Sequence, residues 1–441
     1  MPESNLSRDR LAPAGAPPVP ESPEAIARRN RVLWLSFSGF TLLFGAWTMF
    51  GVLGVPIRQE LGLSDEQLAW LSAVAILNGA VWRLALGILS DRLGGRNVFL
   101  GTFLFAGIAS FVVGRAASYT ELMLGAFLVG VAGNSFAVGS AWCAAWFPKE
   151  KQGFAMGLFG AGNVGASITK FIGPGLMALV PMPLLGGLIP GGWRFIPFLY
   201  SVLIAIMVAL MWWLSPRPDR RPSANRPLGD MLRPLREVRV WRFSLYYTVV
   251  FGAYVAMSVW LPKYYVDVYG LPLSTAALLT TPFILASSLL RPFGGYLSDR
   301  FGPRSVTYVV FTSCLLASAV LFLPLGLYPF AAMVLVIGIA QGIGKASTIK
   351  YIPEYYPKDV GAVVGLVGAL AALGGFIMPP LFAYLARWGG SPQSMFWVIF
   401  AVTAVSLIWL HAVVRSLKRA EANLGIHVMD AQPSPAPAAA E

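Results

Sequence analysis

The chain has 441 residues, of which 56% are hydrophobic and only 12% carry a charge. Soluble domains carry about twice that share of charged residues, so the composition excludes an ordinary soluble fold. A formal net charge of +13 would also suit a nucleic-acid-binding protein. However, the basic residues cluster at the chain ends and between long apolar runs. This placement indicates a membrane protein with no nucleic-acid partner.

Twelve apolar runs are each long enough to cross a bilayer, which takes about 20 residues in a helix. The sequence therefore predicts an all-α membrane protein with twelve transmembrane helices. The predicted spans are residues 33–56, 68–90, 97–115, 121–146, 153–180, 195–215, 243–265, 274–298, 305–326, 329–352, 360–386 and 394–415.

Arginine and lysine residues concentrate at both chain ends and in alternate connections, most densely in the segment 216–241. The connections between these hold few basic residues, as in LGLSDEQ. By the positive-inside rule, both termini and this segment are cytoplasmic, and the protein lies in the cell (inner) membrane. The expected organisation is a disordered N-terminus (1–29), a six-helix half (30–215), a basic linker (216–241), a second six-helix half (242–416) and a disordered tail (417–441).

Two pairs of motifs indicate that the chain uses one unit twice. RLALGILSDRLGGR begins at Arg83, and RPFGGYLSDRFGPR begins 208 positions later, at Arg291. The glycines of FPKEKQGFAMGLFGA, which begins at Phe147, recur at the same offset in YPKDVGAVVGLVGA, which begins at Tyr356. Two parallel six-helix halves about an axis along the membrane normal are the major facilitator arrangement, which is the fold we expect.

Both halves carry the pattern G-x-L-S-D-R-x-G-x-R after their second helix. The pattern resembles the cytoplasmic loop motif of major facilitator transporters. An aspartate at a helix end, flanked by arginines, can hold neighbouring helices together by charge. The motif therefore predicts a conformational role and says nothing about the substrate. Its candidate gating residues are Gly87, Asp91, Arg92, Gly295, Asp299 and Arg300.

Two arginines are predicted to lie inside the membrane. Arg83 and Arg291 each precede the aspartate of their motif by eight residues. That is roughly 12 Å along a helix, near the middle of a hydrocarbon core about 30 Å thick. The predicted helices 1, 2, 4, 5, 7, 8 and 11 have no Asp or Glu at comparable depth. Because a buried unpaired charge is costly, the expected counter-ion is the substrate, an anion. The alternative is that each arginine caps backbone carbonyls or pairs with a carboxylate at a helix end.

Further basic side chains lie within the predicted helices. Lys170 and Lys350 are candidates for carrying a coupled proton, because burial readily changes the protonation of a lysine; snorkelling to an interface is the alternative. The sequence explains no role for Lys345. The two cysteines and two histidines have no metal-binding spacing, so no metal, cofactor or catalytic residue is expected.

Several segments resemble the nitrate/nitrite porter family, the NarK-type branch of the major facilitators. They are WFPKEKQGFAMGLFGAGNVGAS, its counterpart YYPKDVGAVVGLVGALAALGGF, and the arginine-containing stretches NGAVWRLALG and SSLLRPFGG. The resemblance covers nearly all of residues 33–415 and implies that Arg83 and Arg291 grip the anion. The other binding residues that it implies are Tyr247, Phe251, Phe136, Asn163 and Phe50.

The resemblance further implies a transporter that moves nitrate by alternating access, with nitrite left open as a second substrate. The lysines of helices 5 and 10 resemble the branch regarded as nitrate/proton symporters, so symport is the main expectation. Nitrate/nitrite exchange is the alternative, because one bound anion leaves a positive charge in excess and an empty site would be reluctant to reorient. The expected partners are these anions, protons and the lipid bilayer, and the expected state is a monomer without a cofactor.

There are three rival functions. An oxalate or formate exchanger would use the same arginines but would need a longer cavity. A membrane-embedded enzyme is disfavoured, since no set of nucleophile, base and orienting group appears. A sensor is disfavoured because no appended soluble domain is expected.

Overall fold

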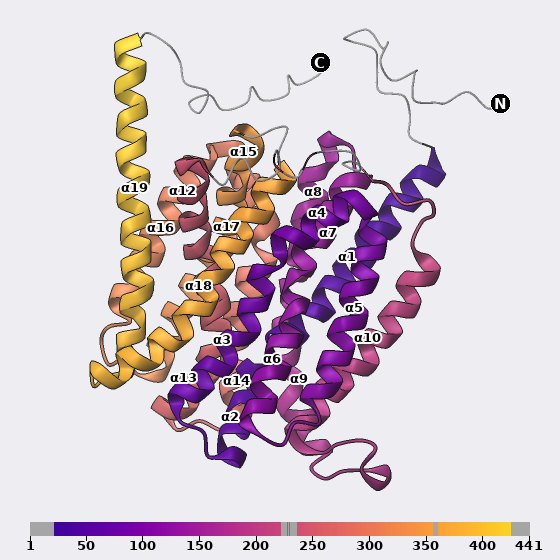
Figure 1. Cartoon of the computed structure of the whole chain (residues 1–441). Helices are drawn as coiled ribbons and strands as arrows, with labels where there is room; N and C mark the ends of the chain where they lie inside the picture. The colour runs from indigo at the N-terminus through magenta and orange to yellow at the C-terminus, as the bar shows by residue number, and fades with distance from the viewer. Residues whose placement is uncertain (1–21, 222–226, 228, 230–235, 356–359, 425–441) are drawn as a thin grey trace, which may run out of the picture.

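The computed structural model describes residues 22–221, 227, 229, 236–355 and 360–424. These residues form a bundle of long helices that lie side by side (Figure 1). Helix α1 (Pro23–Trp47) begins and helix α19 (Met395–Leu424) ends at the same end of the bundle. A chain that crosses the membrane an even number of times returns to the side where it began, so this arrangement agrees with the twelve helices that the sequence predicts.

Eleven helical segments of the described chain are long and apolar enough to span a membrane. The remaining span expected from the sequence, residues 153–180, coincides with a continuous helical segment from Lys149 to Leu179. Together these segments confirm the predicted twelve helices.

The first six membrane segments are built from ten α-helices and intervening short turns. Besides α1 these are α2 (Phe50–Leu61), α3 (Asp65–Val81), α4 (Arg83–Leu93), α5 (Gly95–Val113), α6 (Tyr119–Val129), η2 (Gly130–Asn134), α7 (Ser135–Trp146), α8 (Lys149–Gly160), η3 (Ala161–Val164), α9 (Gly165–Leu179), η4 (Leu185–Gly187), η5 (Gly192–Arg194) and α10 (Phe195–Leu214).

The second six segments repeat this plan. They are α12 (Val238–Tyr247), η7 (Thr248–Gly252), α13 (Ala253–Tyr269), α14 (Leu273–Leu289), α15 (Arg291–Phe301), α16 (Pro303–Val320), α17 (Leu327–Tyr355), α18 (Val360–Trp388), η8 (Pro392–Ser394) and α19.

Helical structure extends further at both ends than the sequence predicted. Residues 23–29, expected to be disordered, form the first turns of α1. The Ser22 side chain accepts a hydrogen bond from the Ala25 amide at 3.2 Å, which caps this helix. Glu24 and Arg28 then pair across one turn at 2.5 Å. Helix α19 likewise continues past residue 416 to Leu424, through residues that are mostly good helix formers.

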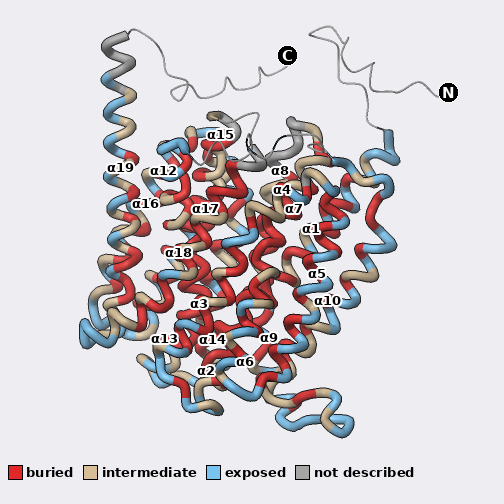
Figure 2. Tube along the Cα trace, in the orientation of Figure 1, coloured by how far each residue is buried: buried red, intermediate tan, exposed pale blue. Residues whose placement is uncertain are grey.

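The two halves meet along the centre of the bundle. Helix α18 packs along α3 and α4, α14 along α9, and α13 along α2. Buried residues fill this central region, whereas exposed residues line peripheral helices such as α10 and α19 (Figure 2). Large apolar side chains such as Trp213 and Ile408 are exposed on these outer helices. An apolar outer surface of this kind suits contact with lipid.

Helix geometry is interrupted at several places in the central segments, including the break between α1 and α2. Helix α3 gives way to α4 at Trp82, and α14 gives way to α15 at Leu290. The segments η2 and η3 are 3-10 turns inside longer helices, and η7 is a π-helical turn. Such irregularities are common at functional sites, and broken helices line the binding sites of many transporters.

The repeated loop motif forms two matching turns at the end of the bundle where α1 begins. Gly94 and Gly302 have φ angles of +90° and +79°, which favour glycine, and each closes a turn between two helices. A Cβ placed on Gly87 would lie 3.6 Å from Ala137 of α7, and one on Gly295 would meet no atom within 4 Å. Arg300 donates to Tyr296 of its own helix at 3.3 Å.

The predicted latch residues are only partly described. The side chains of Asp91 and Asp299 lie outside what the structure describes, and Arg92 is half-buried. The latch role of the motif therefore stays a prediction.

A different aspartate, Asp219, joins helices at this end of the first half. Its carboxylate accepts hydrogen bonds from the backbone amide of Arg96 and from the indole of Trp142, both at 2.9 Å. The indole of Trp146 adds a third at 3.1 Å. One carboxylate thus holds the start of α5 against α7.

The opposite end of the bundle is closed by ion pairs between the halves. Arg58 of α2 pairs with Asp65 at 2.7 Å and with Asp267 of α13 at 3.0 Å. Lys263 of α13 pairs with the same two carboxylates, at 3.1 Å from Asp65. Arg387 of α18 also pairs with Glu66 of α3 at 3.1 Å. We call Arg58, Asp65, Lys263 and Asp267 the ion quartet.

Candidate functional site

Arg83 is enclosed between the two halves, with 1% of its surface exposed. Its Nη1 donates to the carbonyl oxygen of Gly368 in α18 at 2.9 Å, and its Nη2 to that of Gly133 in η2 at 2.8 Å. These two nitrogens therefore cap backbone carbonyls, as the alternative to anion binding expected. The buried Nε makes no hydrogen bond within the described protein, so the guanidinium retains a donor for a further acceptor.

Arg291 uses less of its hydrogen-bonding capacity. It is 5% exposed, and its Nη2 reaches the hydroxyl of Tyr247 at 3.5 Å, the long limit for such a bond. Its buried Nη1 makes no hydrogen bond within the described residues. A buried cation with unused donors is unfavourable unless an acceptor is supplied, which an anionic ligand would do.

Each arginine lies against a glycine of the opposite half. Arg83 donates to the carbonyl of Gly368, and a Cβ placed on Gly160 of α8 would lie 2.7 Å from the guanidinium carbon of Arg291. The arginines are 208 positions apart, and so are the two glycines. The pseudo-twofold relation seen in the sequence is therefore present in the contacts of the site.

Aromatic rings pack against both guanidinium groups. The ring centroid of Phe136 lies 6.0 Å from the guanidinium carbon of Arg83 and 5.2 Å from that of Arg291. The ring of Phe251 lies 5.3 Å from Arg83 and stacks on Tyr247, with 5.3 Å between the two ring centroids. These five predicted residues are thus brought together.

Asn163 sits in η3, three residues after Gly160, and is fully buried. Neither atom of its side-chain amide makes a hydrogen bond within the described protein. Its backbone carbonyl accepts from the hydroxyl of Tyr254 at 3.4 Å. An unpartnered buried amide is costly, so this side chain is also suited to a ligand that supplies the missing partner.

Phe50 is buried at the start of α2, but the ring of the first membrane segment that lies over Arg83 belongs to Trp47. The centroid of that ring is 5.8 Å from the guanidinium carbon, and its indole donates to Ala75 at 2.9 Å. Sequence reasoning missed Trp47. A binding role for Phe50 stays a prediction.

The two proposed coupling lysines differ in their surroundings. Lys170 in α9 is fully buried, and its Nζ donates to the carbonyl of Ala166 at 3.4 Å. Snorkelling to an interface does not describe a side chain so enclosed. Lys350 in α17 is half-buried. Coupling roles for both stay predictions.

Lys345, for which the sequence offered no role, is fully buried next to the site. Its Nζ donates to the hydroxyl of Ser287 at 2.8 Å and to the carbonyl of the same residue at 3.1 Å. It also lies 3.2 Å from the ring centroid of Tyr254. Because Ser287 precedes Arg291 by four residues, Lys345 places a third basic side chain about one helical turn from that arginine.

The buried charges of the described residues are all basic. They include no Asp or Glu, in agreement with the deep carboxylates missing from the predicted helices. Arg83 and Arg291 keep buried donors that have no partner among the described residues, and positive charge of this kind favours binding of an anion. The buried charged residues are Arg29, Arg83, Arg96, Lys170, Lys263, Arg291 and Lys345.

This arrangement is suited to binding. Guanidinium forks and an amide present hydrogen-bond donors, while the rings of Phe136 and Phe251 provide flat apolar surfaces. A small planar oxyanion can take donors at its edge and rings at its faces. The donors come from both halves, so binding such an anion would draw the halves together.

Comparisons with known proteins show the family to which the chain belongs. The family model described as Major Facilitator Superfamily matches residues 35–337 and 274–435. A Thermus thermophilus protein named "Probable nitrate/nitrite antiporter NarK1" is 61% identical over 414 residues, which cover 89% of this chain and 94% of that protein. The "Nitrite extrusion protein" of Bacillus subtilis is 30% identical over 385 residues, covering 86% and 94%.

Among solved structures, a bacterial homologue of the human lysosomal transporter Spinster, in an inward-facing and occupied conformation, matches with a TM-score of 0.67. The alignment covers 91% of this chain and 98% of that one at 18% identity, which supports the fold alone. The predicted major facilitator fold is thus confirmed, and the chain is a membrane transporter rather than an enzyme. It belongs to the NarK-type nitrate/nitrite transporter family of the major facilitator superfamily.

Proposed function

We propose that this protein exchanges nitrate for nitrite across the cell membrane by alternating access. The observation that carries the proposal is the pair Arg83 and Arg291, which are both buried near the ring of Phe136 and retain unused donors. The names of the relatives, which mention nitrate, nitrite or both, support the same substrates.

The chemistry of the site favours a flat, singly charged anion. Nitrate and nitrite are planar and accept hydrogen bonds only at their edges, which matches guanidinium and amide donors. Tetrahedral phosphate or sulfate would press against the rings and would leave some donors unmet. Tyr247 and Asn163 add neutral donors that a small oxyanion can use.

Exchange is favoured over the proton symport expected from the sequence. The relative with 61% identity is named an antiporter. The two buried arginines of the site also point this way, because Arg83 and Arg291 together exceed the charge of one bound anion. When the site is empty and strongly positive, the change between its outward-open and inward-open conformations is unfavourable. Influx of one anion therefore requires efflux of another.

Alternating access is proposed to proceed around this central site. The site lies at broken helices, and the ion quartet joins the two halves at one end of the bundle. Opening that end requires these pairs to separate. In the inner membrane, the positive-inside rule assigns the quartet to the outer face and both chain termini to the cytoplasm.

Uptake of labelled nitrate into proteoliposomes tests the proposal. Vesicles loaded with nitrite should take up nitrate rapidly, and anion-free vesicles should take up little even with an imposed inward proton gradient. Accumulation driven by the gradient into anion-free vesicles would establish symport instead. If excess oxalate or formate blocks flux while unlabelled nitrate does not, the substrate assignment is wrong.

A further inference from the structure

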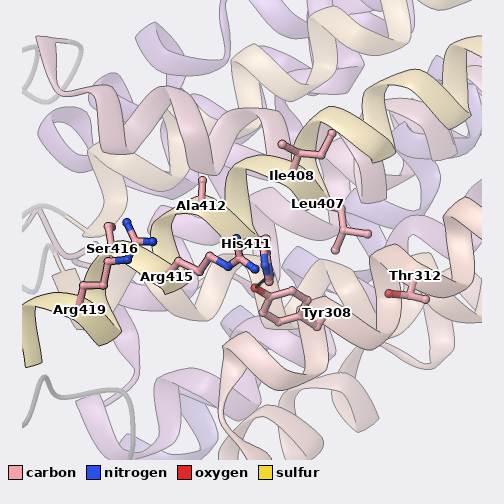
Figure 3. Close-up of a pocket in the computed structure, with 9 residues that line it drawn as sticks. All are labelled: Tyr308, Thr312, Leu407, Ile408, His411, Ala412, Arg415, Ser416 and Arg419. Carbon is pink, nitrogen blue, oxygen red and sulfur yellow. Dashed lines mark hydrogen bonds between the residues drawn. The ribbon is translucent and has the colours of Figure 1, made fainter. Parts of the chain in front are cut away.

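A groove with a cavity volume of about 730 Å³ lies between α16 and α19, far from the central site. Figure 3 shows the nine side chains that line it. Three other surface hollows of the described chain are lined without any charged side chain. This groove alone among them holds arginines, so its chemistry differs from that of an ordinary lipid-facing crevice. Its lining residues are Tyr308, Thr312, Leu407, Ile408, His411, Ala412, Arg415, Ser416 and Arg419.

The polar side chains follow one face of α19. His411, Arg415 and Arg419 recur every four residues, so they stand above one another along the helix. The hydroxyl of Tyr308 lies 3.2 Å from the Nδ1 atom of His411 and fixes the ring of that histidine against α16. Both arginines are exposed and point along the groove (Figure 3). Two adjacent guanidinium groups form a natural binding place for a phosphate.

The opposite part of the groove is apolar. Leu407 and Ile408 precede His411 on α19, and Thr312 faces them from α16. Ile408 is 68% exposed, so its side chain is available to a neighbouring molecule. A soluble phosphate would leave this apolar part uncovered, whereas an acyl chain would cover it.

The depth of the groove matches the edge of a bilayer. Helix α19 begins at Met395, and Arg415 lies twenty residues later, roughly 30 Å along the helix. This is about the thickness of a hydrocarbon core, so the arginines reach the headgroup layer while Leu407 stays among acyl chains. The helix also stands at the outer edge of the bundle and continues beyond its neighbours (Figure 1).

We propose that this groove binds one anionic phospholipid of the cytoplasmic leaflet. Arg415 and Arg419 hold its phosphate, His411 and Tyr308 mark the inner limit of the headgroup, and Leu407 and Ile408 pack on an acyl chain. Basic pockets between membrane helices on the cytoplasmic side are known places for such headgroups. Bound lipid would tie α19 to α16 and stabilise the second half.

Native mass spectrometry and thermal unfolding of the purified full-length protein test this site. Phosphatidylglycerol should remain bound as one molecule per chain and raise the melting temperature more than phosphatidylcholine does. The Arg415→Gln/Arg419→Gln variant should bind phosphatidylglycerol roughly thirtyfold more weakly, because two charged contacts are lost. The Arg28→Gln/Arg31→Gln variant removes two charges from α1 and should bind as the wild type does.

A second variant covers the case in which the double arginine variant does not fold. Thr312→Trp fills the apolar part and keeps both arginines, so it should abolish the preference for phosphatidylglycerol. The proposal is overturned if phosphatidylcholine stabilises the wild type equally, or if inorganic phosphate alone reproduces the shift. Unchanged lipid binding in the groove variants would overturn it as well.

Discussion

Arg83 in the first half donates a hydrogen bond at 2.9 Å to the carbonyl oxygen of Gly368 in the second. The symmetry-related arginine, Arg291, lies against the symmetry-related glycine, Gly160. A carbonyl held by a cation across the interface links the position of α18 to the state of the site. An anion that competes for the donors of Arg83 would weaken this contact, which gives binding a route to helix movement.

The two glycines predict an asymmetric pair of variants. In Gly160→Ala the new methyl would lie 2.7 Å from the guanidinium carbon of Arg291, so that side chain must move. In Gly368→Ala the nearest atoms of Arg83 are 3.5 Å away, an ordinary contact. Displacing a charged group by about 1 Å can cost roughly a hundredfold in activity.

We therefore expect nitrate transport to fall at least about tenfold in Gly160→Ala and less than about threefold in Gly368→Ala. Initial rates of exchange in proteoliposomes, normalised to the amount of inserted protein, measure both. Equal loss in the two variants would show that the contact between Arg291 and Gly160 does not limit transport.

Replacement of Arg83 by lysine tests the guanidinium fork. The wild-type side chain reaches Gly133 and Gly368 with separate nitrogens, which a single ammonium cannot do in the same geometry. Each charge-assisted hydrogen bond contributes about 1.5–3 kcal/mol, so Arg83→Lys should lose roughly ten- to hundredfold in transport although the charge is kept. Nitrate uptake at the wild-type rate by this variant would remove Arg83 from the site.

How much the sequence predicts depends on whether a feature follows from spacing or from packing. The repeat offset and the helical rise placed Arg83 and Arg291 at equal depth, and the structure buries both. The partner of Arg83 could not be predicted, because it depends on how α18 packs on α4. Trp47 was missed because α1 ends there and α2 begins at Phe50. The break changes which side chains face the centre of the bundle, so a regular helix drawn through this segment does not identify Trp47 as the ring that faces Arg83.

Two buried asparagines in the 3-10 turns of the first half provide a comparison. Asn134 in η2 donates to the carbonyls of Asn78 and Val131 at 3.2 and 3.1 Å. The amide of Asn163 in η3 has no partner within the described protein. Removing a bonded amide costs stability, whereas removing an unbonded one does not.

Asn134→Ala should therefore lower the melting temperature, and Asn163→Ala should leave it unchanged or higher. Asn163→Ala should instead raise the nitrate concentration needed for half-maximal exchange by about two- to tenfold, the value of one neutral hydrogen bond. Unfolding curves and concentration-dependent uptake separate the two effects. A large loss of stability in Asn163→Ala, with unchanged half-saturation, would make its role structural.

The ion quartet predicts a change in the balance between conformations. Lys263→Met removes the ion pair with Asp65, which joins α13 to α3, and the ion pair with Asp267 within α13. The end of the bundle closed by the quartet should therefore open more often. Cysteine placed at the buried position Ser258 reports opening through reaction with a membrane-impermeant maleimide, because the native Cys143 and Cys314 are buried.

Labelling of Ser258→Cys should be several-fold faster with Lys263→Met than without it. Arg387→Met is the control: its pair with Glu66 is exposed, and such surface pairs contribute about 0–1 kcal/mol. Labelling that is equally slow in all three backgrounds would show that the quartet does not hold this end closed.

Lys345 tests whether a third cation tunes the site. Lys345→Met nearly preserves the side-chain volume and removes the charge that Ser287 and Tyr254 hold near Arg291. Loss of the attraction between this charge and the bound anion should reduce nitrate affinity by about three- to tenfold, since two partly screened opposite charges attract with on the order of 1 kcal/mol. Titration of the purified variant with labelled nitrate gives the affinity, and a wild-type value would assign Lys345 to packing alone.

The central claim is that Arg83 and Arg291 jointly hold one planar anion. Equilibrium binding of labelled nitrate to the purified protein tests it most directly, with the Arg83→Lys/Arg291→Lys variant as the charge-matched comparison. We predict one nitrate per wild-type chain, displaced by nitrite and not by sulfate, and at least about hundredfold weaker binding in the double variant. Undiminished nitrate binding by the folded double variant would contradict the claim.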